Sequence, residues 1–445
     1  TETLIDAGIT NILVLEAADY IGGRAKSMNL DNSINDPNSF GESSNVPFDL
    51  GAEWLYNTGS EQEETLEAME YLNAALQNSK RTAIPLENGR IYQKKKDGSV
   101  EILEDQDEWM EEIWWDGFLK FRRNRLDDLE GLSYAEAIDQ FIDRGGWTDD
   151  ESLQFLNLME DLISTEYTAD SEQFNVEEVQ FSTEGYSIRT HYMAIPGMGF
   201  GNIAANYAGP FKEKIQLNSK VTEIVTKVEN DEYTTTVKYE QDGVNKAVMT
   251  ETVLVTVSLG VLKAGTINFV PPLPDRKQES IDNMGFGLVN KCIMTWDNDG
   301  DLVWPRNQLW FLLMTPEDET SGEWTTFYNP SKFKGKPSLT AWAGGDDAVK
   351  AETQSDEEIL STVMNNLRSM FPEIRDPDRV IISRWGQDEN IRGTYSFPVP
   401  GRDFYEDADN LQLKVGRIYF AGEATGSGWA TTMGAWNTGE EQAFY

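Results

Sequence analysis

The chain is poor in the two side chains that most often carry enzyme chemistry. Its 445 residues include one cysteine, Cys292, and one histidine, His191. A single thiol excludes an intrachain disulfide, and a single imidazole excludes a histidine-rich metal cluster or a histidine pair. We therefore expect no metal site, and a chemistry that depends on neither cysteine nor histidine.

Positive charge is also scarce, and long apolar runs are missing. Lysine and arginine total 37 against 77 aspartate and glutamate residues, which gives a net charge of -40. Such an excess repels nucleic-acid phosphates and anionic membrane surfaces. No apolar run approaches the roughly 18 residues that a membrane span requires. We expect neither nucleic acid nor a membrane as a partner; the oligomeric state and the compartment, cytoplasmic or secreted, stay open.

The most informative stretch that is present is LVLEAADYIGGR, near the start of the chain. A short apolar strand, Ile12 to Leu15, ends in Glu16, where a carboxylate can accept hydrogen bonds from both hydroxyls of an adenosine ribose. The paired glycines Gly22 and Gly23 let the backbone approach a pyrophosphate, and Arg24 offers it a bidentate fork. The stretch predicts half of a dinucleotide-binding fingerprint.

The other half of this fingerprint, a glycine-rich loop, precedes such a strand by about 20 residues and would fall upstream of Thr1. The segment ETLIDAG has the pattern of the last turns of a crossover helix, with Gly8 at its end. We therefore expect the chain to begin inside a βαβ unit. That expectation leaves open whether the chain as given binds the cofactor.

A second turn of this kind follows the apolar strand at 415–419 near the end of the chain. Its sequence is FAGEAT, in which Gly422 and Glu423 lie before a predicted helix that begins near Thr432 and Met433. The N-terminus of a helix carries partial positive charge and free amide groups. The turn therefore suits a second contact with an anionic or electron-rich cofactor.

Between these two turns, helical and strand patterns alternate several times. Helical patterns occupy Glu61–Gln77, Asp105–Glu166 and Ser355–Phe371, and a hairpin is predicted over Asn88–Val100. Strands are predicted over Ile215–Val228, Tyr233–Tyr239, Val248–Val257, Lys291–Trp296, Gln308–Met314, Ser338–Trp342 and Arg417–Ala421. Interleaving of this kind predicts an α/β protein of two discontinuous domains.

Seven motifs, taken together and in order, resemble the flavin-dependent amine oxidases. They are LVLEAADYIGGRAKS, DLGAEW, IQLNSKVTEI, VLVTVSLGVLKAGTINFVPPLP, GFGLVNKCIMTW, ISRWGQDENIRGTYSF and YFAGEAT. They extend over nearly the whole chain, and VSLGVL with GAEW is similar to the polyamine oxidase branch. The resemblance implies a Rossmann-like FAD-binding domain, formed by residues 1–80, 186–275 and 386–445 and truncated at its N-terminus. A substrate-binding domain of mixed sheet flanked by helices would comprise 81–185 and 276–385.

The resemblance also implies which residues contact the cofactor, FAD. Glu16 would bind the ribose, Gly22, Gly23 and Arg24 the pyrophosphate, and the Val221 backbone the adenine. The remaining FAD contacts implied by the resemblance are Gly51, Ala52, Glu53, Trp54, Trp385, Gly422, Glu423, Thr432 and Met433. The only thiol, Cys292, is expected to face the opposite side of its strand, so the FAD is expected to be bound noncovalently.

Lys291 is the residue to which the resemblance assigns the chemistry. Its neighbours Val289, Cys292, Ile293 and Met294 indicate a buried strand, in which an unpaired ammonium group is costly. In the family, the lysine of such a strand holds a water against the reactive nitrogen of the flavin. Without the family, a lysine that extends from an edge strand into solvent would be the simpler interpretation.

Aromatic residues are expected to enclose the substrate amine. Tyr395 matches one wall of the family's aromatic cage, where a ring face stabilises positive character. The opposite wall aligns with Thr431, and Trp429 is the alternative for that position. Trp54, Tyr186 and Trp385 are further aromatic candidates, although buried aromatic residues more often belong to a core.

The chain departs from the family at Tyr56, where polyamine oxidases commonly carry an acid or a histidine. We include Tyr56 among the expected substrate contacts. The negative charge that binds the amine would then come from elsewhere, and Glu53, Glu166 and Asp170 are the candidates.

These observations predict an FAD-dependent oxidase of an amine, most readily a polyamine, with dioxygen as the second substrate. The amine would give a hydride to the flavin, the imine would hydrolyse, and dioxygen would become hydrogen peroxide. An L-amino-acid or monoamine oxidase of the same family is the alternative enzyme. A peptide-binding relative without catalytic activity is the alternative from another class.

Overall fold

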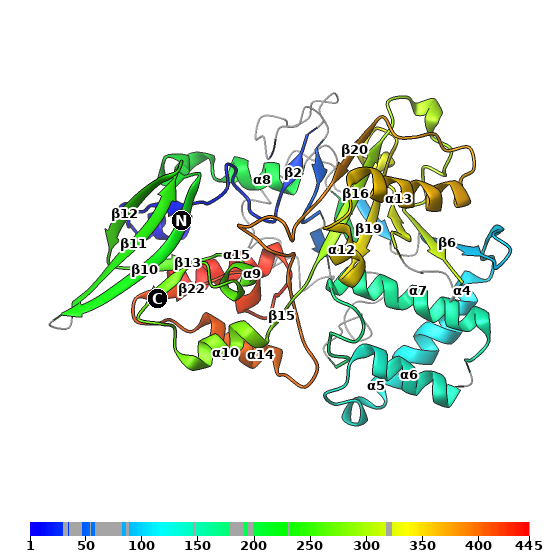
Figure 1. The fold of residues 1–445 in the computed structure, drawn as a ribbon, viewed down its shortest axis with the longest axis horizontal. Coiled ribbons are helices and arrows are strands. Elements are labelled where there is room, and N and C mark those ends of the chain that lie inside the picture. Colours follow the sequence, from blue (N-terminus) through cyan, green and yellow to red (C-terminus); the bar gives the residue numbers. More distant parts are fainter. Residues whose placement is uncertain are drawn as a thin grey trace.

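The computed structural model describes residues 1–29, 34, 47–53, 55–57, 82–85, 89–145, 147–177, 191–194, 199–229, 232–316 and 323–444. The molecule is elongated (Figure 1), with a long ribbon of strands at one end and a larger sheet covered by helices at the other. Both chain termini lie at the ribbon end.

The segments around the two predicted cofactor turns form two short parallel strand pairs. In one, β1 (Val14–Leu15) pairs with β9 (Ile215–Gln216). In the other, β13 (Val253–Val255) pairs with β22 (Ile418–Phe420). The helix α15 (Thr432–Ala443) follows β22 after a 3-10 turn at 423–425. Parallel pairing places the carboxyl ends of each pair at one edge, where both predicted cofactor turns begin.

The helix predicted before β1 is present as α1 (Glu2–Asp6), and Gly8 after it has φ +85°. A positive φ is the conformation that ends a helix and that glycine adopts at low cost. Glycine at this position therefore explains why the chain leaves the helix and turns toward β1.

A twisted ribbon projects from this region (Figure 1). It consists of β10 (Ser219–Glu229), β11 (Glu232–Gln241), β12 (Val244–Thr250) and β14 (Asn268–Val270). A cluster of buried and half-buried apolar side chains from β10, β11, β13 and β22 joins the ribbon to the strand pairs. The prediction of one continuous strand over Val248–Val257 is wrong. The structure has two strands there, β12 and β13, which are separated at 251–252 and belong to different sheets.

The other end of the molecule is built on a seven-stranded mixed sheet in the order β20-β16-β19-β18-β17-β6-β7. Its strands are β6 (Gly89–Lys94), β7 (Val100–Ile102), β16 (Val289–Thr295), β17 (Trp310–Met314), β18 (Thr326–Tyr328), β19 (Ser338–Gly344) and β20 (Arg379–Ile382). One face packs against α13 (Asp356–Met370), which begins with a capping box formed by Ser355 and Glu358. Every residue of β16 is buried, so this strand lies at the centre of the domain.

Helices cover the opposite face of this sheet at the β6 and β17 side. They are α4 (Gln106–Trp109), a π-helix at 110–119, α5 (Lys120–Arg123), α6 (Tyr134–Gly145) and α7 (Asp150–Tyr167). Aromatic and aliphatic side chains of these helices share one core with Ile91 and Met314 of the sheet. The predicted helical character of the stretch from Asp105 to Glu166 is confirmed.

Shorter elements connect the two ends. The helices are α8 (Phe200–Tyr207), α9 (Leu259–Lys263), α10 (Asp275–Asn283), α11 (Ser331–Lys334), α12 (Gly345–Ala351) and α14 (Phe404–Gln412). The strands are β2 (Ser27–Met28), β3 (Phe48–Asp49), β4 (Leu55–Asn57), β5 (Thr82–Pro85), β8 (His191–Ala194), β15 (Gly285–Phe286) and β21 (Ser396–Phe397). The helix predicted over Glu61–Gln77 lies outside the described residues.

Over the ranges given above, none of the helices combines the length and apolar character that a membrane crossing needs. The same residues contain no group of three or more histidine, cysteine, aspartate or glutamate side chains that could hold a metal ion.

Candidate active site

Lys291 lies in the middle of β16, and 2% of its surface is exposed. Its Nζ donates to the backbone oxygens of Asp49 (3.0 Å) and Gly51 (2.9 Å) and to Oε2 of Glu53 (2.9 Å). The ammonium group also lies 4.4 Å from the ring centroid of Trp342 on the neighbouring strand β19. The predicted burial is therefore confirmed, and the charge is compensated by a carboxylate, two carbonyl oxygens and an aromatic face.

These contacts hold the segment 47–53 against the large sheet. Lys334 Nζ donates to the backbone oxygen of Pro47 at 2.6 Å. Trp385 Nε1 donates to the backbone oxygen of Leu50 at 3.1 Å. The side chains of Lys291, Lys334 and Trp385 thus bind four backbone carbonyl groups of one segment. We call this segment, residues 47–53, the strap.

The strap is also bound to β2 and α8 through Asp49. Its buried carboxylate accepts hydrogen bonds from Ser27 Oγ (2.5 Å) and from the backbone N–H of Phe200 (2.8 Å). Lys334 Nζ lies 3.8 Å from Asp49 Oδ2. Burial raises the pKa of Asp49, and the neighbouring Lys334 charge opposes that rise. The strap is therefore fixed from both sides of the molecule.

Gly51 lets the strap pass directly beside Arg24. A Cβ at Gly51 would lie 1.8 Å from the backbone oxygen of Arg24, far below any real contact distance. The neighbouring Ala52 N–H donates to that same oxygen at 3.2 Å. Only glycine permits two backbones to approach this closely.

Replacing Gly51 with alanine is expected to lower the free energy of unfolding by about 1–3 kcal/mol, because two backbone segments must separate. Gly439→Ala is the matched control, since a Cβ there meets no atom within 4 Å and the residue lies inside α15. Denaturant unfolding of the two variants measures the difference. Equal stabilities for Gly51→Ala and Gly439→Ala would contradict the close approach.

Arg24 and Glu423, predicted as two separate cofactor contacts, bind each other. Arg24 NH1 donates to Glu423 Oε1 at 2.8 Å and to the backbone oxygen of Thr394 at 2.6 Å. Glu423 Oε2 accepts from Ser396 Oγ (2.7 Å) and from the backbone N–H of Ala430 (2.9 Å). This buried carboxylate joins the first turn, the segment 394–396 and the turn before α15.

The residues around this pair fit an anionic cofactor. Gly23 (φ +57°) and Gly422 (φ +144°) both have open space where a side chain would project. Arg24 and Glu423 line one small cavity together with Val257, Leu259 and Gly422. A guanidinium group between two side-chain-free turns is an arrangement that can accept a pyrophosphate. Gly22, with φ +126°, belongs to the same loop.

Glu16 and Val221 lie together at the β1–β9 pair. Glu16 follows β1 directly, its Oε1 accepts from the Ala18 N–H at 2.8 Å, and its backbone oxygen accepts from Ser219 at the start of β10. Burial raises the pKa of Glu16, and the N–H groups of Ala18 and Ala17 oppose that rise. Val221 lies at a register shift between β10 and β11, where the strand departs from regular pairing.

The predicted aromatic wall Tyr395 is half-buried, and its hydroxyl donates to the backbone oxygen of Glu166 at 2.6 Å. The Glu166 side chain is exposed. Thr431 caps α15: its Oγ1 donates to the Gly428 oxygen at 2.6 Å and accepts from the Gly434 N–H at 2.9 Å. Tyr395 is therefore tied to the end of α7 through its hydroxyl, and Thr431 is fixed at the N-terminus of α15.

Trp429, the alternative for the second wall, packs on two aromatic rings. Its ring centroid is 5.2 Å from that of Phe404 and 6.0 Å from that of Tyr167. It thus forms part of the contact between the end of α7 and the start of α14. Thr432 and Met433 are the first residues of α15, as predicted.

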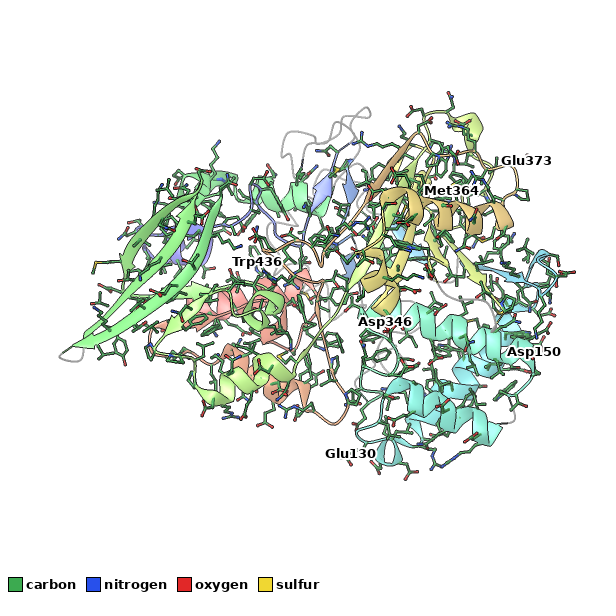
Figure 2. The ribbon with its side chains drawn as sticks, in the orientation of Figure 1. Glu130, Asp150, Asp346, Met364, Glu373 and Trp436 are labelled. Carbon is green, nitrogen blue, oxygen red and sulfur yellow. The ribbon has the colours of Figure 1, made fainter. Side chains whose placement is uncertain are left out.

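Trp54 and Tyr186 lie outside the described residues. The structure describes the backbone of Tyr56, which lies in β4 and pairs with Tyr192 of β8. Asp170 accepts the backbone N–H of Asp346 with both carboxylate oxygens, at 3.1 and 3.0 Å, where α12 begins above α7 (Figure 2).

Asp170 belongs to a group of acidic side chains between α7 and α12. Burial, followed by the charges of Asp347, Glu160 and Asp170, raises the pKa of Asp161 to about 8. Burial likewise raises the pKa of Asp347 to about 7 and that of Asp170 to about 6. Between pH 6 and 8 these groups lose their protons in the folded protein and then repel one another.

This group predicts a stability that falls as the pH rises. Asp161 has a pKa of about 3.9 when unfolded, so between roughly pH 4 and 8 the folded state binds more protons, and each rise in pH favours unfolding. Asp161→Asn should therefore raise the melting temperature at pH 8 and change it little at pH 5. The exposed turn variant Asp242→Asn is the control, and thermal unfolding at both pH values is the measurement. A shift that is equal at pH 5 and pH 8 would refute the assignment.

Comparison with known proteins identifies the family of the chain. The chain matches the family of flavin-containing amine oxidoreductases over residues 2–444. It is 28% identical over 425 residues to polyamine oxidase 5 of Oryza sativa subsp. japonica, covering 93% of this chain and 78% of that protein. It is 28% identical to polyamine oxidase 2 of Arabidopsis thaliana, covering 98% and 83%. A shorter match, 36% identical over 244 residues, covers 52% of this chain and 22% of a histone demethylase-like protein A of Aspergillus fumigatus.

The fold is similar to that of a solved putrescine oxidase bound to putrescine. The TM-score is 0.73 at 17% sequence identity, over 100% of this chain and 94% of that one. The chain therefore belongs to the flavin-containing amine oxidoreductases. It is a flavin-dependent amine oxidase with noncovalently bound FAD, and the predicted family, α/β fold class and cofactor are confirmed.

Several residues that shape the site carried no signal in the sequence. Asp49 joins the strap to Ser27 and Phe200, Lys334 binds the strap at Pro47, Ser396 binds Glu423, and Trp342 covers the Lys291 ammonium group. Asp49 lies inside the DLGAEW motif and could have been suspected from it. The other three are separated from their partners by 27 to 287 residues, and no local pattern marks them.

Proposed function

We propose that this protein oxidises a polyamine, using FAD and dioxygen, to an aldehyde and a shorter amine with release of hydrogen peroxide. The observation that carries the proposal is the buried Lys291 in a strand that follows the family's motif. Support comes from the relatives, since the polyamine oxidases align with 93% and 98% of this chain, whereas the demethylase-like match covers about half of it.

Each part of the site has a role in this proposal. When bound, FAD would supply the acceptor for a hydride from the carbon next to the amine nitrogen, and dioxygen would take up the electrons. Arg24, Gly23 and Gly422 would hold its pyrophosphate, and Glu16 its ribose. Tyr395 and the ring of Trp385 would confine a slim alkyl amine, and Lys291 would supply a fixed positive charge at the reacting end.

We also propose the domain division given by the sequence. The FAD-binding domain would comprise 1–80, 186–275 and 386–445, and the substrate-binding domain 81–185 and 276–385. Support comes from the separate apolar cores of the two halves, one around the ribbon and strand pairs and others on the two faces of the large sheet. Lys291, Lys334 and the strap then lie at the boundary between the domains.

A second candidate is oxidation of a lysine side chain in a basic peptide. It is favoured by the higher identity of the demethylase-like matches, 36% and 37%, over about half of the chain. The net charge of -40 is compatible with either a polyamine or a basic peptide.

Peroxide release from a panel of amines tests the proposal. The panel comprises spermidine, spermine, tyramine, leucine and a dimethyl-lysine peptide, each with FAD-saturated protein. We expect the highest kcat/KM for spermidine or spermine. Peroxide from leucine or tyramine alone would identify the alternative enzyme, and peroxide from the peptide alone would identify the second candidate.

A further inference from the structure

The ammonium group of Lys291 has no N–H donor left over. An ammonium has three donors, and here they go to the oxygens of Asp49, Gly51 and Glu53. The side chains of the Lys291–Glu53 ion pair are 3% and 8% exposed. Glu53 therefore fixes both the position and the net charge of the lysine that the proposed function puts beside the flavin.

The surrounding charges balance in pairs. Lys334 lies 3.8 Å from Asp49 Oδ2 and 2.6 Å from the backbone oxygen of Pro47. The two lysines, Lys291 and Lys334, are thus matched by two acids of the strap, Glu53 and Asp49. The formal charges of these four buried side chains sum to zero. Removal of any one of them leaves a buried, uncompensated charge in a region of low dielectric constant.

We infer that Glu53 is a positioning residue that neutralises Lys291 and thereby lowers the reduction potential of the flavin. This inference rests on the proposed function, which puts the flavin next to Lys291. Reduction adds negative charge to the flavin, so a nearby ammonium favours the reduced form and a carboxylate disfavours it. Because Lys291 and Glu53 are both charged, their effects on the flavin oppose each other. The reduction potential therefore depends on the two residues together.

Three variants separate these effects by sign. Glu53→Gln keeps the shape of the side chain but leaves the ammonium uncompensated, so the midpoint potential of the bound flavin should become more positive. Lys291→Met leaves the carboxylate uncompensated, so the potential should become more negative. The double variant Glu53→Gln/Lys291→Met removes both charges and should return close to the parent value. Spectroelectrochemical titration of the FAD-loaded proteins measures all three.

Two further variants exclude a merely structural explanation. Glu53→Asp retains the negative charge and should therefore have the same midpoint potential as the parent protein. Glu352→Gln removes a carboxylate that binds Asn290 at 2.8 Å, next to Lys291 in β16, and should leave the potential unchanged. If Lys291→Met fails to fold, the contrast between Glu53→Gln and Glu53→Asp decides by itself.

The outcomes distinguish this inference from the proposed function. Bound FAD with potentials that are equal in Glu53→Gln, Glu53→Asp and the parent would overturn the role of Glu53 and leave the proposed function standing. Failure of the parent to bind FAD, or to be reduced by any amine, would overturn the proposed function together with the role assigned to Glu53.

Discussion

Replacing Lys291 with methionine is expected to slow amine-dependent reduction of the flavin, or its reoxidation, by about 10²- to 10³-fold. That range is typical for the loss of one preorganised polar group in a water-excluded active site. Lys291 is 2% exposed and its ammonium group is held by three oxygens, so the charge is fixed in one place away from bulk solvent. Stopped-flow absorbance of the flavin, first without and then with dioxygen, resolves the two half-reactions.

The matched control for this variant is Lys277→Met. Lys277 is also buried, at 3% exposure, and its Nζ donates to two backbone oxygens at the end of α14. Loss of this lysine should lower stability and leave the rate of flavin reduction unchanged. Unchanged rates in Lys291→Met as well would remove Lys291 from the reaction.

Replacing Glu423 with alanine is expected to have the largest effect on stability, about 3–5 kcal/mol. Removal of one partner of a buried ion pair leaves the other charge without compensation. Here the side chain of Glu423 is 5% exposed, and its loss would leave Arg24, which is 26% exposed, without its carboxylate. The hydroxyl of Ser396 and the N–H of Ala430 would lose their acceptor as well. FAD affinity should fall in parallel, because the turns that carry Gly23 and Gly422 would no longer be joined.

The exposed ion pair between Glu406 and Arg276 provides the comparison for this variant. Its carboxylate is 63% exposed and the N···O distance is 3.3 Å, so Glu406→Ala should cost less than about 1 kcal/mol. Chemical denaturation of both variants gives the free energies, and FAD titration gives the affinities. A Glu423→Ala cost no larger than that of Glu406→Ala would mean that the pair between Arg24 and Glu423 does not join the two turns.

The sequence predicted the features that depend on local pattern. Alternating and apolar runs located β10, β16 and β19, and the helical pattern over Ser355–Phe371 located α13. The burial of Lys291 followed from its apolar neighbours. The break that separates β12 from β13 was missed, because the apolar pattern of Val248–Val257 continues through the point at which the chain changes sheets.

Contacts between distant segments could not be predicted in this way. Arg24 and Glu423 are 399 positions apart, and each was interpreted separately as a cofactor contact. Lys291 and Glu53 are 238 positions apart, and Glu53 was assigned to the cofactor or the amine rather than to the lysine. These pairs bring together segments that lie in or beside strands of different sheets, and only the three-dimensional fold specifies that they meet.

Anaerobic mixing of the FAD-loaded protein with spermidine tests the central claim most directly. The proposed function predicts that the oxidised flavin absorbance bleaches in a single turnover, and that air restores it with one hydrogen peroxide formed per flavin. A protein that binds FAD and stays fully oxidised with spermidine and spermine, while another amine reduces it, would contradict the polyamine assignment. A protein that no amine reduces would contradict amine oxidation altogether.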